Sequence, residues 1–239
     1  MTTKSPTPPS VLVLDFDGTV CVGDGPVRVY ARANAELLAP DRARTLLSEL
    51  EALLDGRRPH SGYGDGYALV ADLGGRHLTP GQTRECYRLS RQWLAEHPDE
   101  VTAPPGLAAM LEQMAGTVRR VLVTNSPEAS ALTALDDLGL SGGVDEVIGA
   151  AGKPAGFPAV LDALRAERPA WACMSVGDFW VNDIEPALAR GWCTAWLNPL
   201  GLDPRPANLT GPDLAGVEAG LLEWSRSPRT FASRYPARP

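Results

Sequence analysis

An apolar run, Val11–Leu14, leads directly into the sequence Asp15-Phe16-Asp17-Gly18-Thr19. A continuous apolar run of this kind is typical of a strand that is buried on both faces, so the pattern predicts a β-strand over residues 11–15. Two carboxylates at positions i and i+2 and a glycine turn follow at its end. Such a strand end can present one carboxylate and one main-chain carbonyl to a metal ion, with the second carboxylate beside them.

Beyond residue 104, predicted strands and helices alternate along the chain. Apolar runs predict strands over 118–124, 144–148, 172–176 and 193–197. Helical periodicity predicts helices over 107–115, 129–138, 157–167 and 184–190. This alternation predicts an α/β fold: a Rossmann-like parallel sheet of about five strands with right-handed crossovers.

The segment between the first two predicted strands has a different character. Helical periodicity covers residues 30–38, 43–54 and 83–96, without a strong strand signal, and Pro104-Pro105-Gly106 marks the end of the block. We therefore predict a core made of residues 1–20 and 104–239, with an all-helical cap, residues 21–103, inserted into it. Residues 225–239 are rich in Pro, Arg and Ser, and we expect them to be loosely ordered.

Charge and composition exclude several classes of partner. The net charge of −7 and the isoelectric point near 5.0 argue against a nucleic-acid-binding protein, which usually carries a basic face. No apolar run approaches the ~20 residues of a membrane span, and residues 1–10 lack the apolar region of a signal peptide. The cysteines at positions 21, 86, 173 and 193 form no CxxC or zinc-ligand pattern. We expect reduced thiols in a cytoplasmic protein with no membrane or nucleic-acid partner, and the oligomeric state stays open.

Polar segments follow the predicted strands at several points. The first holds Asp15 and Asp17, and the second is Thr124-Asn125-Ser126. The third is Gly152-Lys153-Pro154, and the fourth runs from Gly177 to Asp183 and contains Asp178. Because ligands bind at the carboxyl ends of the strands in an open α/β sheet, we expect these segments to converge.

Together these residue types suit phosphoryl transfer. An anionic nucleophile is repelled by a phosphoryl group unless cations are present, and Mg²⁺ prefers the oxygen ligands that Asp15, Asp178 and Asp183 could supply. Lys153 would add a second positive charge; two unit charges 4 Å apart interact by about 4 kcal/mol at an effective dielectric near 20.

Hydrogen-bond donors for the phosphoryl oxygens are also present. The Thr124 hydroxyl and the backbone N–H groups around Gly18 and Asn125 are the candidates. An attacking carboxylate would form an aspartyl-phosphate, and a second carboxylate would protonate the leaving oxygen and later activate water. Of two coupled carboxylates, the one farther from the metal takes a proton more easily, which assigns Asp15 as nucleophile and Asp17 as acid and base.

With these residues in this order, the chain resembles the haloacid dehalogenase (HAD) superfamily of hydrolases. The resemblance covers four motifs, whose functional residues correspond to Asp15 and Asp17, to Thr124, to Lys153, and to Asp178 with Asp183. It implies that Mg²⁺ binds Asp15, the main-chain carbonyl of Asp17 and Asp178, with Asp183 bound directly or through water. True dehalogenases of the superfamily lack the second motif I aspartate, so Asp17 favours phosphate chemistry.

The predicted cap resembles that of the subgroup with phosphoglycolate phosphatase-like and β-phosphoglucomutase-like enzymes. We therefore expect a Mg²⁺-dependent phosphatase for a small phosphorylated metabolite. A phosphotransferase or mutase with the same site, and a non-catalytic binding protein on the same fold, are the alternatives. Within the cap, the polar loop His60–Tyr67 would either contact substrate or simply connect helices. Arg84 and Arg88, at i and i+4, would bind a second anion or, as favoured, face solvent.

Overall fold

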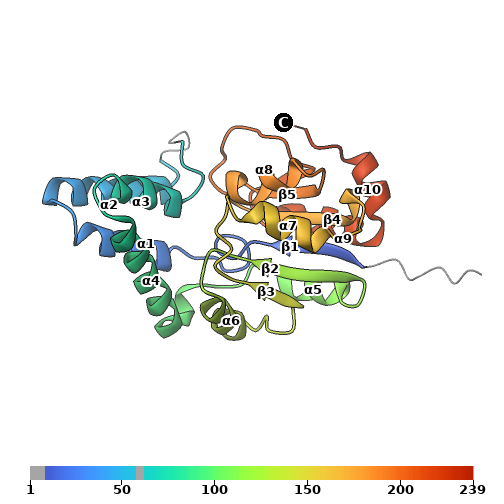
Figure 1. The fold of residues 1–239 in the computed structure, drawn as a ribbon, viewed down its shortest axis with the longest axis horizontal. Helices are drawn as coiled ribbons and strands as arrows, with labels where there is room; N and C mark the ends of the chain where they lie inside the picture. The colour runs from blue at the N-terminus through green and yellow to red at the C-terminus, as the bar shows by residue number, and fades with distance from the viewer. Residues whose placement is uncertain (1–8, 58–61, 239) are drawn as a thin grey trace, which may run out of the picture.

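A parallel sheet forms the centre of the protein in the computed structural model, which describes residues 9–57 and 62–238 (Figure 1). Its strands are β1 (Ser10–Leu14), β2 (Val118–Val123), β3 (Glu146–Ile148), β4 (Cys173–Gly177), β5 (Cys193–Leu197) and β6 (Leu209–Gly211). Their order is β3-β2-β1-β4-β5-β6, and every neighbouring pair is parallel. The predicted α/β fold with a parallel-sheet core is confirmed.

The register of the central strands aligns their carboxyl ends. Leu14, at the end of β1, lies opposite Leu122 of β2 and Val176 of β4. The residues that follow these strands therefore leave the sheet at one common edge.

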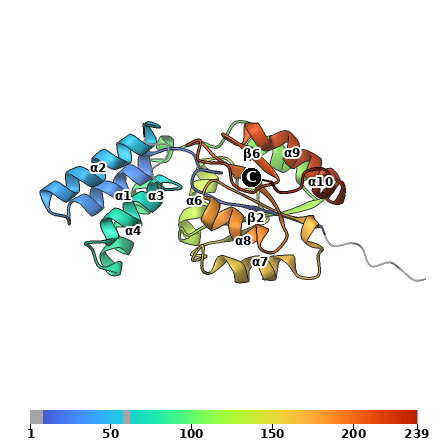
Figure 2. The ribbon, with the colours of Figure 1, turned by 90° about the horizontal axis from the view of Figure 1, so that it is seen from above.

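Helices cover both faces of the sheet (Figure 2). On one face lie α5 (Leu107–Met114), α6 (Glu128–Asp137), α9 (Ala215–Arg226) and α10 (Pro228–Arg234), and on the other lie α7 (Phe157–Arg165) and α8 (Glu185–Leu188). The alternation of side chains along β1 serves both layers, because Leu12 and Leu14 pack with the first group and Val11 and Val13 with the second. Short helical turns occupy Pro98–Glu100, Ala170–Ala172 and Trp180–Ile184.

Two features of the core differ from the prediction. The strand β6 was not expected, because it is three residues long and half-buried at the sheet edge and so has no apolar run. The expectation of a loosely ordered C-terminal region is wrong for α10: Phe231 is fully buried, and the Tyr235 hydroxyl donates to Glu223 at 3.0 Å. The burial of Phe231 and the packing of Ala232 and Tyr235 against the core hold a segment whose composition is otherwise mostly polar.

Between β1 and β2 the chain forms the helices α1 (Gly25–Ala35), α2 (Pro40–Leu54), α3 (Gly66–Gly75) and α4 (Pro80–Glu96), which we call the helical insert. They lie to one side of the sheet (Figure 1) and share an apolar cluster that includes Tyr30, Leu50 and Leu69. The chain leaves and re-enters the core where Val22 and Thr102 exchange backbone hydrogen bonds of 2.9 and 2.8 Å. The insert falls within residues 21–103, whose assignment as a separate cap domain stays a prediction.

The third helix of the insert was not expected from the sequence. It contains glycine at both ends and carries no charged residue in its first turn, which weakens a sequence signal for a helix. Asp65 caps its N-terminus, since its side chain accepts a hydrogen bond of 2.6 Å from the backbone N–H of Ala68.

All four cysteines are free and buried, as expected for reduced thiols. Within the described residues, none of the helices combines the length and apolar character needed to cross a membrane.

Candidate active site

Three carboxylates converge at the carboxyl edge of the sheet. Asp15 follows β1, Asp178 follows β4, and Asp183 lies in the turn Trp180–Ile184 that comes next in the chain. Each offers an oxygen, and these oxygens all lie within 4.8 Å of one another. The structure thus brings together the three carboxylates that the sequence assigned to a metal ion.

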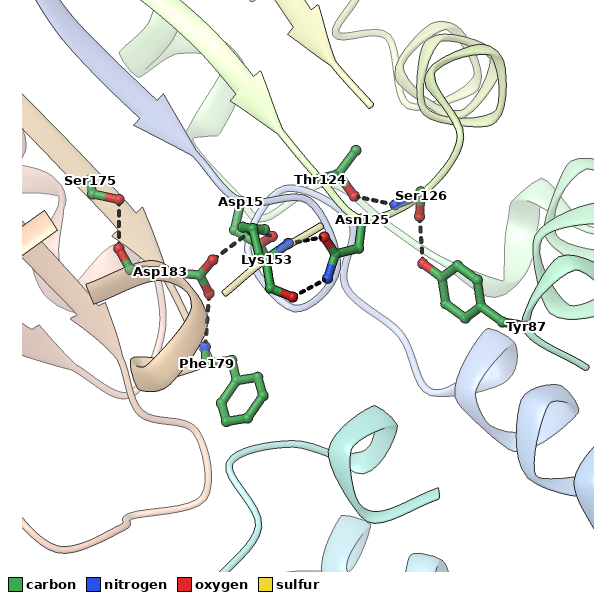
Figure 3. A network of polar contacts seen from close by, with 9 residues as sticks. All are labelled: Asp15, Tyr87, Thr124, Asn125, Ser126, Lys153, Ser175, Phe179 and Asp183. Atoms are coloured by element: carbon green, nitrogen blue, oxygen red, sulfur yellow. Dashed lines mark hydrogen bonds and ion pairs between the residues drawn. The ribbon is translucent and has the colours of Figure 1, made fainter. Parts of the chain in front are cut away.

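Lys153 lies between two of these carboxylates (Figure 3). Its ammonium group pairs with Asp15 and, at 2.6 Å, with Asp183, and its side chain is only 3 % exposed. Asn125 holds the backbone of this lysine, because Lys153 N–H donates to Asn125 Oδ1 at 2.7 Å and Asn125 Nδ2 donates to the Lys153 carbonyl at 3.0 Å. The side chain of Asn125 therefore positions the lysine, while the predicted phosphate contact of its backbone N–H stays a prediction.

The crowding of the carboxylates changes their titration. Burial, together with Asp183, raises the pKa of Asp15 to about 7 although Lys153 opposes the shift. Burial and the Asp15 carboxylate raise the pKa of Asp178 well above its ordinary value. Burial alone would lower the pKa of Lys153, but Asp15 and Asp183 outweigh it and raise that pKa. The cluster carries more negative charge than its lysine balances, and its oxygen donors fit Mg²⁺, which would stabilise the ionised forms.

Thr124 is placed to serve as a hydrogen-bond donor. It follows β2, is 1 % exposed, and its Oγ accepts a hydrogen bond of 3.0 Å from the backbone N–H of Ser126 (Figure 3). Because the oxygen acts as the acceptor in that contact, the hydroxyl hydrogen is left to donate to a bound oxyanion. The donation of this hydroxyl to a phosphoryl oxygen stays a prediction.

Gly18 contributes in a different way from the one predicted. Its N–H donates to the Cys21 carbonyl at 2.9 Å, so in this conformation it does not donate to a phosphate. Its φ is +77°, and a Cβ added there would lie 2.1 Å from Asp178 Oδ2. Glycine is required because the turn is left-handed and passes against the Asp178 carboxylate. In the described part of the chain, the N–H groups of Phe16 and Asp17 pair with no backbone carbonyl, which leaves them as donors at the strand end.

The Asp17 carboxylate contacts the helical insert. Arg91 Nη1 donates to Asp17 Oδ1 at 2.7 Å, and the Tyr67 hydroxyl lies 3.4 Å from the same oxygen. Arg91 also donates to the Tyr67 hydroxyl, and its guanidinium lies 5.3 and 5.1 Å from the ring centres of Tyr67 and Tyr87. The carboxylate is therefore outside the metal-type cluster, and the predicted coordination by the Asp17 carbonyl stays a prediction.

Two more insert residues border the site. The Tyr87 hydroxyl forms a hydrogen bond of 2.8 Å with Ser126 Oγ, which joins α4 to the loop after β2 (Figure 3). Asp65 lies near the carboxylate cluster, and its pKa is raised to about 6 by burial and by Asp15, against the Ala68 N–H that stabilises its charge. A pocket of about 110 Å³ is lined by residues of both the core and the insert.

A family model described as haloacid dehalogenase-like hydrolase matches residues 9–191 of this chain. The matched range includes every motif residue of this site. The chain belongs to the haloacid dehalogenase-like hydrolases. A search of curated proteins finds no match.

Solved structures with this fold include enzymes of different activity. A HAD-hydrolase from Bacillus subtilis, YfnB, described as bound to magnesium, has a TM-score of 0.59 at 16% identity over 89% of this chain and 98% of its own. A HAD phosphatase from Thermococcus onnurineus has a TM-score of 0.55 at 20% identity, over 88% and 96% of the two chains. A 2-haloacid dehalogenase from Pseudomonas syringae pv. Tomato DC3000 has a TM-score of 0.51 at 22% identity, over 90% and 99%. The shared fold hosts phosphatase and dehalogenase alike, so the reaction of this HAD-like hydrolase must be argued from its own residues.

Sequence reasoning placed Asp65 and Tyr67 of the insert in a loop that would either contact substrate or connect helices. It missed Tyr87 and Arg91, which this hydrolase brings to the site from α4. The favoured interpretation of Arg84 and Arg88, that they face solvent, agrees with their exposure, and Arg88 pairs with Glu85 at 2.7 Å. Arg91 lies on the face of α4 that also buries Ser90 and Leu94. An arginine on the apolar face of a helix is rarely buried without a partner, and this was the available signal. Of the loop His60–Tyr67, residues 60 and 61 lie outside the described residues, but Tyr67 does reach Asp17.

Proposed function

We propose that the protein is a Mg²⁺-dependent phosphatase that hydrolyses a small phosphate monoester through an aspartyl-phosphate on Asp15. The observation that carries this proposal is the convergence of Asp15, Asp178 and Asp183 within 4.8 Å around Lys153. The presence of Asp17 beside this cluster supports phosphate chemistry over carbon–halogen cleavage. When bound, Mg²⁺ would supply positive charge for the phosphoryl oxygens and orient them.

In the first step Asp15 attacks phosphorus, and the bond from phosphorus to the alcohol oxygen breaks. Lys153 and the Thr124 hydroxyl stabilise the charge on the transferred group. Asp17 gives its proton to the leaving alcohol oxygen. The phosphoryl group is then bound to the Asp15 carboxylate.

In the second step Asp17 takes a proton from water, and that water attacks phosphorus. Inorganic phosphate leaves and the Asp15 carboxylate is regenerated. Arg91 and Tyr67 hold the Asp17 carboxylate in place through both steps. The insert, which contacts Asp17 and Ser126 in the core, shields the reacting groups from bulk water.

The substrate in this proposal is a small phosphorylated metabolite, bound without a nucleic-acid or membrane partner. We place the reaction in the cytoplasm, which the free thiols support.

The test is phosphate release from a panel of phosphate monoesters, with Mg²⁺ and with EDTA, by wild type, Asp15→Asn and Asp162→Asn. Wild type should release phosphate only with Mg²⁺. The rate of phosphate release by Asp15→Asn should be lower by more than about 10³-fold, because the nucleophile is gone. Asp162 is an exposed carboxylate paired with Arg190 and serves as the matched control.

Two parallel assays separate the other reactions. Halide release from 2-chloropropionate without Mg²⁺ would indicate a dehalogenase and contradict the proposal. Transfer of the phosphoryl group to a second hydroxyl of a sugar phosphate would indicate a mutase. Folded protein that releases phosphate from no ester would also overturn the proposal.

A further inference from the structure

A second cavity, of about 480 Å³, lies between the helical insert and the core. It shares Asp17, Asp65, Tyr67 and Asp178 with the smaller pocket around Asp15. Because the two spaces share these side chains, the larger cavity opens beside the reacting groups. Its volume lies in the range of small-molecule sites, roughly 300–1,000 Å³.

The walls of this cavity are mostly apolar. The insert contributes Val27 from α1 and Leu53 and Leu54 from α2, and the core contributes Leu197 and Leu200. Leu200 also packs against the apolar cluster of the insert, so the two walls meet there. Such a surface favours a ligand that removes hydrocarbon from water.

The ionisable side chains of the cavity are acidic. Its described lining contains no Lys, Arg or His, and contains Asp17, Asp24, Asp65, Asp178 and Asp213. Among the described arginines, two pair with carboxylates of this lining, since Arg28 lies 3.5 Å from Asp24 and Arg91 lies 2.7 Å from Asp17. A carboxylate or second phosphate on the substrate would therefore find no cationic side chain in the described lining to pair with, which is unfavourable.

We propose that this cavity binds the alcohol part of the substrate, and that this alcohol is uncharged and largely apolar. The inference rests on the proposed phosphatase function and narrows it to monophosphates of cycloalkyl, aryl or branched alkyl alcohols. The smaller pocket holds the phosphoryl group, and the alcohol oxygen lies at the boundary that Asp17 marks. Phosphorylated acids and bisphosphates are poor substrates.

The first test compares three phosphate esters of primary alcohols in the presence of Mg²⁺: 2-cyclohexylethyl phosphate, ethyl phosphate and 4-phosphonooxybutanoate. The kcat/KM for the cyclohexyl ester should exceed that for the carboxylate ester by roughly 10- to 100-fold, because only the apolar group fits the walls. The kcat/KM for ethyl phosphate should also be lower than that for the cyclohexyl ester, since ethyl phosphate fills little of the cavity.

A substitution in the wall sharpens the test. Leu200→Arg places a cation on the half-buried core wall and should lower kcat/KM for the cyclohexyl ester while raising it for 4-phosphonooxybutanoate, each by about tenfold. Leu132→Arg is the matched control, because Leu132 is 48 % exposed on α6, outside the cavity. It should leave the ratio of the two rates unchanged.

The outcomes separate this inference from the proposed function. Wild type that releases phosphate in an Asp15-dependent manner, but prefers the carboxylate ester or ignores Leu200→Arg, overturns the assignment of the cavity and leaves the phosphatase proposal standing. Folded wild type that acts on none of the three esters and on no other monoester overturns both.

Discussion

The core and the helical insert contribute to the candidate site through different kinds of contact. In the core, Asp15 and Asp178 are fixed by the ends of adjacent parallel strands, and Lys153 is held through its backbone by Asn125. In the insert, Tyr67 and Arg91 reach the site only through their side chains, at the Asp17 carboxylate. The sheet edge can therefore assemble the reactive groups by itself.

This difference separates chemistry from substrate selection. A change at the sheet edge alters the groups that bond to phosphorus or hold the metal ion, so it should act on turnover. A change in the insert alters a surface that closes over the substrate, so it should act more strongly on KM and on substrate preference.

The largest effect after loss of the nucleophile is expected for Lys153→Met. The variant keeps a long apolar stem but removes the cation that pairs with Asp15 and Asp183. We expect kcat to fall by about 10³-fold, because the charge of the transferred phosphoryl group is no longer offset. Phosphate release at saturating substrate, with circular dichroism as the check on folding, measures it. A change confined to KM would contradict the role of Lys153 in turnover.

Asp178→Asn and Asp183→Asn should both raise the Mg²⁺ concentration needed for half-maximal activity, by about 10- to 100-fold. They should differ in stability. Asp183 accepts hydrogen bonds from Lys153 and, at 3.2 Å, from the Phe179 N–H, so its loss should lower the free energy of unfolding by about 1–3 kcal/mol.

The Asp178 carboxylate forms no ion pair or hydrogen bond with the rest of the described chain, and its pKa is raised by burial and by Asp15. Without metal, Asp178→Asn should therefore be as stable as wild type or more so. Chemical denaturation in EDTA compares the two variants. Equal losses of stability would contradict the view that Asp178 serves mainly the metal ion.

Arg91→Gln tests the insert. The substitution removes a buried cation that holds Asp17 and Tyr67, and we expect kcat/KM to fall by roughly 10- to 100-fold, less than for Lys153→Met. Arg88→Gln on the same helix is the control, because Arg88 is exposed and pairs with Glu85. Steady-state kinetics of both variants measures the two changes in kcat/KM. Similar losses in the two would show that Arg91 matters only as part of the helix.

The pH dependence of stability tests the carboxylate cluster without substrate. The folded-state pKa of Asp15 is about 7 and that of Asp65 about 6, both above the ordinary value of 3.8. The folded state therefore binds more protons than the unfolded state between about pH 4 and pH 7, and stability should fall as the pH rises through this window. Thermal unfolding in EDTA should show a lower Tm at pH 8 than at pH 5. Added Mg²⁺ should raise the Tm by more at pH 8 than at pH 5. If the Tm in EDTA rose with pH for both wild type and Asp15→Asn, this account would be contradicted.

The sequence predicted the core half of the site because strand ends are local features. Asp15, Thr124 and Asp178 each follow an apolar run, and parallel strands bring such ends to one edge. Lys153 comes after only a short strand, yet its place in the order of the motifs identified it. The role of Gly18 could not be read in the same way, because the N–H that appeared free in the sequence bonds to Cys21 in the turn.

The insert half could not be predicted because its contacts depend on how separate helices pack. Tyr67 is the second residue of α3 and Arg91 lies in the C-terminal half of α4, and no sequence pattern fixes the angle that brings both to Asp17. The apolar positions predicted α1, α2 and α4; α2 and α4 begin within three residues of the expected starts, whereas α1 begins at Gly25 rather than at residue 30. Periodicity therefore predicts which helices exist, and tertiary packing decides which of their polar residues enter the site.

The smallest expected effect concerns the hydrogen bond of 2.8 Å between Tyr87 and Ser126, which links the insert to the loop beside Thr124. Tyr87→Phe keeps the ring that packs against Arg91 and removes only the hydroxyl, so kcat should change little while KM rises a few-fold. Ser126→Ala should have the same effect. In the double variant the two losses of kcat/KM should not add. A double-mutant cycle on kcat/KM should therefore give a coupling energy of about 0.5–1.5 kcal/mol between the two hydroxyls. Full additivity would mean that the two hydroxyls act independently, and the contact would then play no part in holding the insert over the substrate.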